Sequence, residues 1–122
     1  MLDSNMKAID IKAFVPAKDF ALSQQFYKDI GFNQKSEGSG VAFLSLGSCN
    51  FLLQDFYQQQ LAENFMMHLQ VADAQQWHLH ISQLNLAKYG TILSELVEQP
   101  WAMLDFVFND PSGVLWRVGQ NI

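Results

Sequence analysis

The spacing of apolar and polar residues in the first half of the chain predicts a strand, a helix and three further strands. Residues 8–15 alternate between apolar and polar side chains, which is typical of a half-buried strand that Pro16 ends. Asp19 is placed to cap a helix over Phe20–Ile30, where apolar residues recur at helical spacing and Gly31 supplies the stop. Gly-Ser turns then separate three expected strands, Phe32–Lys35, Val41–Leu46 and Asn50–Phe56.

The second half repeats this order. A strand is expected at Phe65–Val71, followed by a helix that Asp73 caps. The further strands are expected at Thr91–Leu96, Leu104–Phe108 and Val114–Val118. Gln-Gln-aromatic occurs in both helices, at residues 24–26 and 75–77. Two βαβββ halves joined by the polar segment 58–60 indicate an internal duplication, with repeats at about 7–57 and 64–119 within one domain, residues 1–122.

This pattern predicts an α+β fold. One helix for every four strands covers one face of a sheet and leaves the other face open. Two such βαβββ repeats side by side form curved mixed sheets around a cleft, with the helices on the outer face. Clefts of this kind bind small molecules.

The stretch 98–113, EQPWAMLDFVFNDPSG, organises the second half. Pro100 belongs in a turn or at a strand edge, and residues 109–113 form a second turn, so the strand 104–108 sits in a hairpin. Trp101 falls in the loop before that strand. Two interpretations of this ring stay open: it lines a binding groove, or it packs at the rim of the core.

Composition and charge narrow the class of partner. Seven Lys and Arg against twelve Asp and Glu give a net charge of −5, which argues against nucleic acid. Cys49 stands alone, so neither an internal disulfide nor a Cys-based zinc site is expected. The first ten residues are too polar for a signal peptide, and no apolar run reaches bilayer length. We therefore expect a cytoplasmic protein with no membrane partner.

Several short motifs together resemble one family. They are Val15–Phe20, Phe26-Tyr27 and Gly31-Phe32 in the first half, and Glu98–Trp101, Phe106, Asp110-Pro111, Gly113 and Gln120-Asn121 in the second. With the βαβββ duplication, the chain resembles the glyoxalase/bleomycin-resistance/extradiol-dioxygenase (vicinal oxygen chelate) superfamily over roughly residues 7–121, and most closely its bleomycin-resistance proteins. Those proteins usually carry Gly after the Trp, where this chain has Ala102. The resemblance implies a homodimer with grooves for a small-molecule ligand between the two chains.

The resemblance also implies where metal-using members would hold an ion. Those positions, His or carboxylates in such members, are here Lys12, Gln54, Met66 and Arg117. Two cations repel a divalent ion, and a thioether is too soft for this type of site. His68 lies on the same strand face as Met66, but it has no His or carboxylate partner at ligand spacing. We therefore predict no metal and no cofactor.

The sequence thus predicts a protein that binds an aromatic, drug-like or metabolite-sized molecule without transforming it, and a cation is favoured over an anion. The predicted ligand-binding residues are Trp101, Phe14, Lys12, Gln54, Phe56, Met66, His68 and Arg117. The alternative is a metal-dependent or metal-free superfamily enzyme of lyase, isomerase or dioxygenase type, in which Asp10 and Lys12 act as base and electrostatic stabiliser rather than as a plain ion pair. Arg117, the only Arg, needs a partner, which we expect to be Asp10, Asp105 or a ligand anion.

Overall fold

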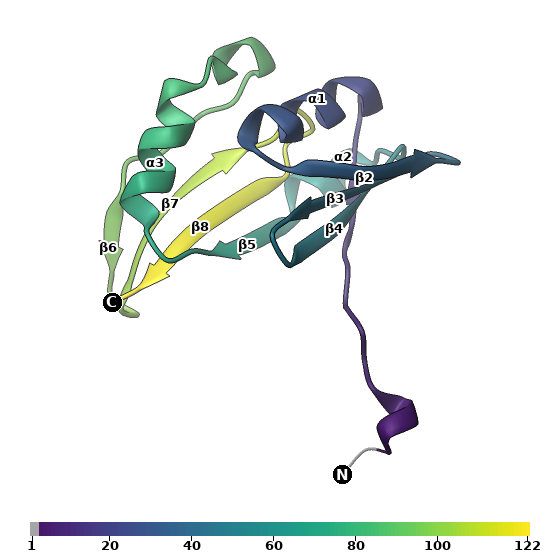
Figure 1. The fold of residues 1–122 in the computed structure, drawn as a ribbon. Helices are drawn as coiled ribbons and strands as arrows, with labels where there is room; N and C mark the ends of the chain where they lie inside the picture. Colours follow the sequence, from purple (N-terminus) through teal and green to yellow (C-terminus); the bar gives the residue numbers. More distant parts are fainter. Residues whose placement is uncertain (1–2) are drawn as a thin grey trace.

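The computed structural model describes residues 3–122, and its strands form two four-stranded sheets (Figure 1). The first sheet has the order β1-β4-β3-β2, made of β1 (Phe14–Pro16), β2 (Asn33–Gly38), β3 (Val41–Leu46) and β4 (Cys49–Gln54). The second has the order β5-β8-β7-β6, made of β5 (Met66–Gln70), β6 (Val97–Gln99), β7 (Met103–Asn109) and β8 (Leu115–Asn121). The pairs β1–β4 and β5–β8 are parallel, and all the other strand pairs are antiparallel. The α+β class with two mixed sheets is confirmed.

Helices α1 (Phe20–Ile30) and α3 (Ala74–Gln83) lie on the same side of the sheets (Figure 1). Both predicted caps are present, since the Asp19 side chain accepts the N–H of Leu22 and the Asp73 side chain accepts the N–H of Gln76. Short helical segments that the sequence analysis did not predict are α2 (Gln59–Glu63), inside the linker, and the 3-10 turns Ser4–Met6 and Leu86–Tyr89. None of the helices in residues 3–122 is long and apolar enough to span a bilayer.

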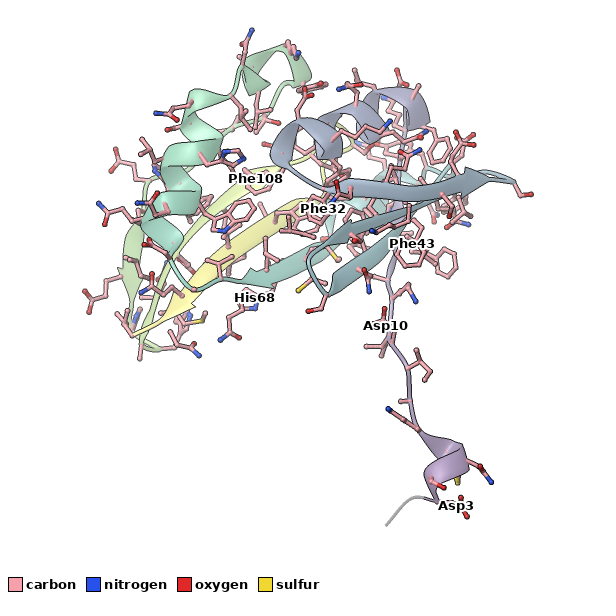
Figure 2. All side chains as sticks on the ribbon, in the orientation of Figure 1. Asp3, Asp10, Phe32, Phe43, His68 and Phe108 are labelled. Atoms are coloured by element: carbon pink, nitrogen blue, oxygen red, sulfur yellow. The ribbon has the colours of Figure 1, made fainter. Side chains whose placement is uncertain are left out.

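A single core lies between the two long helices and both sheets. Tyr27 of α1 meets Phe51 of β4 with ring centroids 5.0 Å apart, and Phe51 meets Trp116 of β8 at 5.3 Å, both near edge to face. Figure 2 shows Phe32 and Phe108 on the helix side of the strands, whereas His68 projects from β5 away from the helices. Because the core covers one face of each sheet, the opposite faces are not covered by helices, and we call them the open faces.

The predicted strand at residues 8–15 is wrong for residues 8–13 and right for Phe14 and Val15. Only Phe14–Pro16 pairs, and the chain before it extends away from the sheets (Figure 1). Ile9 and Ile11 are 87% and 92% exposed. Apolar alternation marks a segment with two different faces, but a strand also needs a neighbour with free hydrogen-bonding groups. Going from β1 toward the N-terminus, backbone pairing ends at Ala13, whose carbonyl accepts the N–H of Leu52 at 3.0 Å.

The predicted strand at Thr91–Leu96 is also wrong. Within it only Leu93 forms an isolated bridge, to Phe108, and the edge strand is β6 further along the chain. Side-chain hydrogen bonds take the place of a strand ladder: the hydroxyl of Ser94 accepts the N–H of Val107, and the hydroxyl of Thr91 donates to the carbonyl of Asn109. Ser and Thr compete with regular structure in this way.

The remaining strands occur where the sequence predicts them, with ends shifted by up to three residues. The equal strand orders of the two sheets support an internal duplication. The repeat limits of about 7–57 and 64–119, and a single domain over the whole chain, stay predictions.

Candidate functional site

The open face of the second sheet carries the densest group of predicted site residues. Alternation along β5 and β8 places Met66, His68 and Arg117 on the side away from the helices. The strand register sets His68 beside Arg117 on one side and Val107 beside Arg117 on the other. Arg117 is therefore at the middle of this face.

An ion pair fixes the position of Arg117. Its guanidinium Nη1 donates to the Oδ2 of Asp105 at 2.6 Å, and the Nε2 of Gln99 donates to Oδ1 of the same carboxylate at 2.9 Å. The Asp105 side chain is 1% exposed and that of Arg117 is 28% exposed. A carboxylate so deeply buried is costly unless it is paired and hydrogen-bonded, as it is here. Of the three partners considered for Arg117, Asp105 is the one in contact.

Gly119 makes space for this pair. A Cβ atom at this position would lie 2.7 Å from the Cε of Met103, 3.2 Å from the Nε2 of His68 and 3.5 Å from the Cβ of Asp105. Any larger residue would push His68 or Met103 away from the open face. The glycine therefore lets side chains of β5 and β7 approach each other across β8.

Trp101 lies in the turn between β6 and β7 and reaches over Arg117. The Cζ atom of Arg117 is 5.9 Å from the centroid of the indole ring, within the range of a cation–π contact. The ring is 56% exposed. Ala102, which follows it, has a φ of +62° in the left-handed region. Trp101 is therefore a loop residue on the open side, and it does not pack in the core.

A groove of about 230 Å³ runs beside the ion pair. Its lining residues are Ser94, Glu95, Val97, Gln99, Asp105, Phe106, Val107 and Arg117. The lining contains two carboxylates, those of Glu95 and Asp105, and one guanidinium, so it carries one net negative charge. A lining of that sign attracts cations.

The other four predicted residues lie on or beside the first sheet. Phe14 and Phe56 are 52% and 46% exposed, and Gln54 pairs with Pro16 at the end of β4. Lys12 lies in the segment before β1, with its Nζ 5.2 Å from the centroid of the Phe43 ring. The structure thus brings the predicted residues together in two groups: Met66, His68, Trp101 and Arg117 on the second sheet, and Lys12, Phe14, Gln54 and Phe56 on the first.

Asp10 and Lys12 form an ion pair. The Nζ of Lys12 is 3.2 Å from the Oδ2 of Asp10, which also accepts from the side-chain amide of Asn50 at 2.8 Å. The hydrogen bonds from Asn50, from the N–H of Ile11 and from Lys12 hold the pKa of Asp10 below its usual value. A lowered pKa makes this carboxylate a weaker base, so the geometry favours an ion pair over a proton acceptor for catalysis.

The four positions at which the resemblance implies metal ligands carry residues that do not fit a divalent ion. Lys12 and Arg117 are each bound to a carboxylate, and neither offers a lone pair. Gln54 and Met66 add one amide and one thioether. Within residues 3–122, no three His, Cys, Asp or Glu side chains lie close enough together to hold a metal.

A second polar cluster, around Asp110, is buried and structural. Asp110 accepts the hydroxyl of Tyr27 at 2.6 Å and the N–H groups of Ser112 and Val114 at 2.8 and 2.9 Å, while Trp116 Nε1 donates to the Tyr27 oxygen at 2.9 Å. Burial raises the pKa of Asp110 and, more strongly, that of Tyr27. Asp110 and Tyr27 are fully buried, so this cluster joins α1 of the first half to the β7–β8 turn of the second.

Of the eight residues that line the groove, Arg117 alone was among the predicted ligand-binding residues. The seven that were missed include Glu95, Gln99 and Asp105, whose side chains carry a carboxylate or an amide. Gln99 belongs to the EQPW motif, and Asp105 interrupts an apolar strand, which is a signal for a buried charge that needs a partner. Glu95 gave no signal, because it lies in the segment that was assigned to the wrong strand.

Comparison with solved structures places the fold. A bleomycin-binding protein complexed with bleomycin superposes with a TM-score of 0.81 at 20% identity, covering 94% of this chain and 100% of that one. The bleomycin-binding protein from Streptomyces verticillus, complexed with copper(II)-bleomycin, gives 0.79 at 18% identity, covering 93% and 96%. Lactoylglutathione lyase from Agrobacterium tumefaciens gives 0.68 at 16% identity, covering 93% and 94%. At these identities the likeness concerns the fold alone.

A comparison with curated proteins gives no match. The family model of the glyoxalase/bleomycin resistance protein/dioxygenase superfamily, in contrast, matches residues 11–118. This span includes both long helices, the strands β1 to β7 and the first four residues of β8. The chain belongs to the glyoxalase/bleomycin resistance protein/dioxygenase superfamily.

Proposed function

We propose that this protein binds a planar aromatic cation of drug or metabolite size and releases it unchanged, without a metal. The ligand lies on the open face of the second sheet, along the groove beside Asp105 and Arg117, and stacks on Trp101. Similar folds that bind bleomycin support a binding role for this architecture.

The observation that carries the proposal is the placement of Trp101. A large ring that is 56% exposed and in contact with Arg117, which lines the groove, offers a stacking surface next to the groove. Met66 and His68 extend this surface along β5 with adaptable apolar and polar contacts.

The charges of the two sheets support a cation. The positive charges of Lys12 and Arg117 are already opposed by Asp10 and Asp105. Glu95 then leaves the groove with one excess negative charge. An anionic ligand would meet a guanidinium whose charge Asp105 already opposes, together with the uncompensated negative charge of Glu95.

We also propose that two copies associate, so that the first-sheet group of one chain faces the second-sheet group of the other. Phe14 and Met66 on the open faces, and Ile9 and Ile11 before β1, are apolar and more than half exposed. A second copy that covers them would reduce this exposed apolar surface. A cytoplasmic location stays a prediction.

The alternative is a superfamily enzyme, metal-dependent or metal-free. It has the support of the fold shared with lactoylglutathione lyase. The residue types at Lys12, Gln54, Met66 and Arg117 weigh against its metal-dependent form.

Native mass spectrometry of freshly purified protein, incubated with a panel of aromatic cations that includes bleomycin and with size-matched aromatic anions, tests the proposal. We expect one cation per chain, no stoichiometric metal, and a ligand of unchanged mass after incubation. Preferential binding of the anions, one metal ion per chain or a change in ligand mass would each overturn it, the last two in favour of an enzyme.

A further inference from the structure

We propose that the protein has a second ligand site: a cavity between β4 and β5 that takes an uncharged, flat aromatic molecule of one or two rings. This cavity has a volume of about 290 Å³. It lies at the seam between the two sheets, where the start of β4 approaches β5. It shares no lining residue with the groove beside Arg117, although His68 also belongs to the stacking surface of the proposed function. Its walls are Phe32, Cys49, Asn50, Phe51, Met67, His68, Leu69, Gln70 and Trp116.

The inner wall of the cavity is aromatic. Phe32, Phe51 and Trp116 are 6%, 2% and 3% exposed and meet one another close to edge to face, with centroids 5.2–5.7 Å apart. The indole N–H of Trp116 already donates to the hydroxyl of Tyr27. It is therefore engaged, and the small part of the three rings that stays accessible is carbon surface on the inner wall of the cavity. A flat ring extends the edge-to-face arrangement they already have.

The outer wall is incompletely covered. Met67 and Leu69 point to the core side of β5, yet both are only half-buried. On β4, across the seam from β5, the core-side residues Phe51 and Leu53 are 2% and 0% exposed. An edge strand whose inward side chains stay open to a cavity leaves apolar surface for a ligand to cover.

The rim selects for an uncharged ligand. Cys49, Asn50, His68 and Gln70 form it, with no carboxylate, Lys or Arg among the lining residues. The Asn50 amide already donates to Asp10. A charged ligand would therefore lose hydration without gaining an ion pair, whereas a neutral ring with one polar edge keeps that edge at the rim.

The size fits one or two rings. Apolar cavities of about 150 Å³ bind benzene, so a volume near 290 Å³ has room for a bicyclic ring such as indole. Ligand sites typically start at about this size.

Cys49 supplies a reporter at the mouth, because it is the only cysteine in the chain and it is exposed. The rate at which its thiol reacts with 5,5′-dithiobis(2-nitrobenzoate) depends on access. We expect saturating indole to slow this reaction roughly tenfold in the wild-type protein, since the ring blocks the path to the thiol. Free tryptophan, a zwitterion with the same ring, should not slow it.

Two variants separate this site from the groove. Leu69→Trp fills the cavity and should remove the effect of indole, and Leu69→Phe serves if the larger ring prevents folding, which thermal melting reports. Trp101→Ala removes the stacking surface of the groove and should keep the protection of Cys49. If aromatic cations fail to bind, that counts against the proposed function, but it does not affect the protection of Cys49 by indole.

The proposal is overturned if indole leaves the Cys49 rate unchanged. It is also overturned if folded Leu69→Phe or Leu69→Trp is protected as well as the wild type, or if Trp101→Ala abolishes the protection. Protection by a higher protein concentration alone would show that a second copy, and not a small molecule, covers the cavity.

Discussion

The indole ring of Trp101 lies over the guanidinium of Arg117, with 5.9 Å between the ring centroid and the Cζ atom. Trp101 belongs to the β6–β7 turn and Arg117 to β8, so this contact ties a loop to the middle of the sheet. The Nη1 atom of Arg117 also lies 2.6 Å from the Oδ2 atom of Asp105. The position of the exposed ring therefore depends on a buried ion pair.

Breaking that pair should destabilise the fold. Arg117→Met leaves Asp105, which is 1% exposed, without its cation, and we expect a loss of about 3 kcal/mol in the free energy of unfolding. Replacing the carboxylate as well, in Arg117→Met/Asp105→Leu, should recover a large part of this loss. Urea unfolding measures the loss in Arg117→Met and its recovery in the double variant. Lys12→Met is the control: its partner Asp10 is 28% exposed and not buried like Asp105, so this change should affect stability less. An Arg117→Met variant as stable as the control would contradict the account.

Ala102→Gly should stabilise the protein. Ala102 has a φ of +62°, a conformation that costs an L-residue about 1 kcal/mol and glycine almost nothing. Part of this gain is offset because glycine makes the unfolded chain more flexible, so we expect a rise in melting temperature that corresponds to less than about 1 kcal/mol. Ala21→Gly, at an exposed position in the first turn of α1, is the matched control and should lower stability by up to about 1 kcal/mol, the penalty for glycine inside a helix. If both glycines destabilise equally, Ala102 is not strained in solution.

Asp110→Asn should cost less stability as pH rises. Burial raises the pKa of Asp110 above the ordinary value of 3.8, so the folded chain keeps this proton to a higher pH than the unfolded chain. The stability that Asp110 contributes is therefore complete below pH 3.8 and declines as pH rises toward the folded-state pKa. Asn does not titrate, and the other groups cancel in the difference between the two proteins. Urea unfolding of both across this range should give a difference that shrinks with pH. A difference that grows with pH would mean that the buried carboxylate is ionised and stabilised.

Local features of the fold could be predicted from the sequence, whereas strand partners and contacts between distant side chains could not. The helix caps Asp19 and Asp73 follow from local chemistry, and both were predicted. The segment with Ile9 and Ile11 has the alternation of a strand but no partner within its own chain, and periodicity carries no information about partners. Trp101 could be placed in a loop, yet its contact with Arg117 depends on the strand register, which sequence does not give.

The exposed segment before β1 should matter for assembly. Light scattering should give a mass of twice 13.9 kDa for the wild type at micromolar concentration. Ile9→Ser/Ile11→Ser removes two side chains that are 87% and 92% exposed and should weaken the dimer, because their apolar surface is what a second copy would cover. Ile92→Ser, which removes an isoleucine that is 77% exposed elsewhere, should leave the mass unchanged. A wild-type monomer, or equal masses for all three proteins, would contradict the proposed association.

The most direct test of the central claim is a calorimetric titration of the best aromatic cation from the panel into wild type, Trp101→Phe and Trp101→Ala. Loss of the stacking ring should weaken affinity roughly tenfold in Trp101→Ala, equivalent to about 1.4 kcal/mol, while Trp101→Phe retains most of the binding. Both variants should melt like the wild type, since a ring that is 56% exposed supports little of the core. Equal affinity of wild type and Trp101→Ala would place the ligand elsewhere, and unfolding of Trp101→Ala would show that the ring serves the fold and not the ligand.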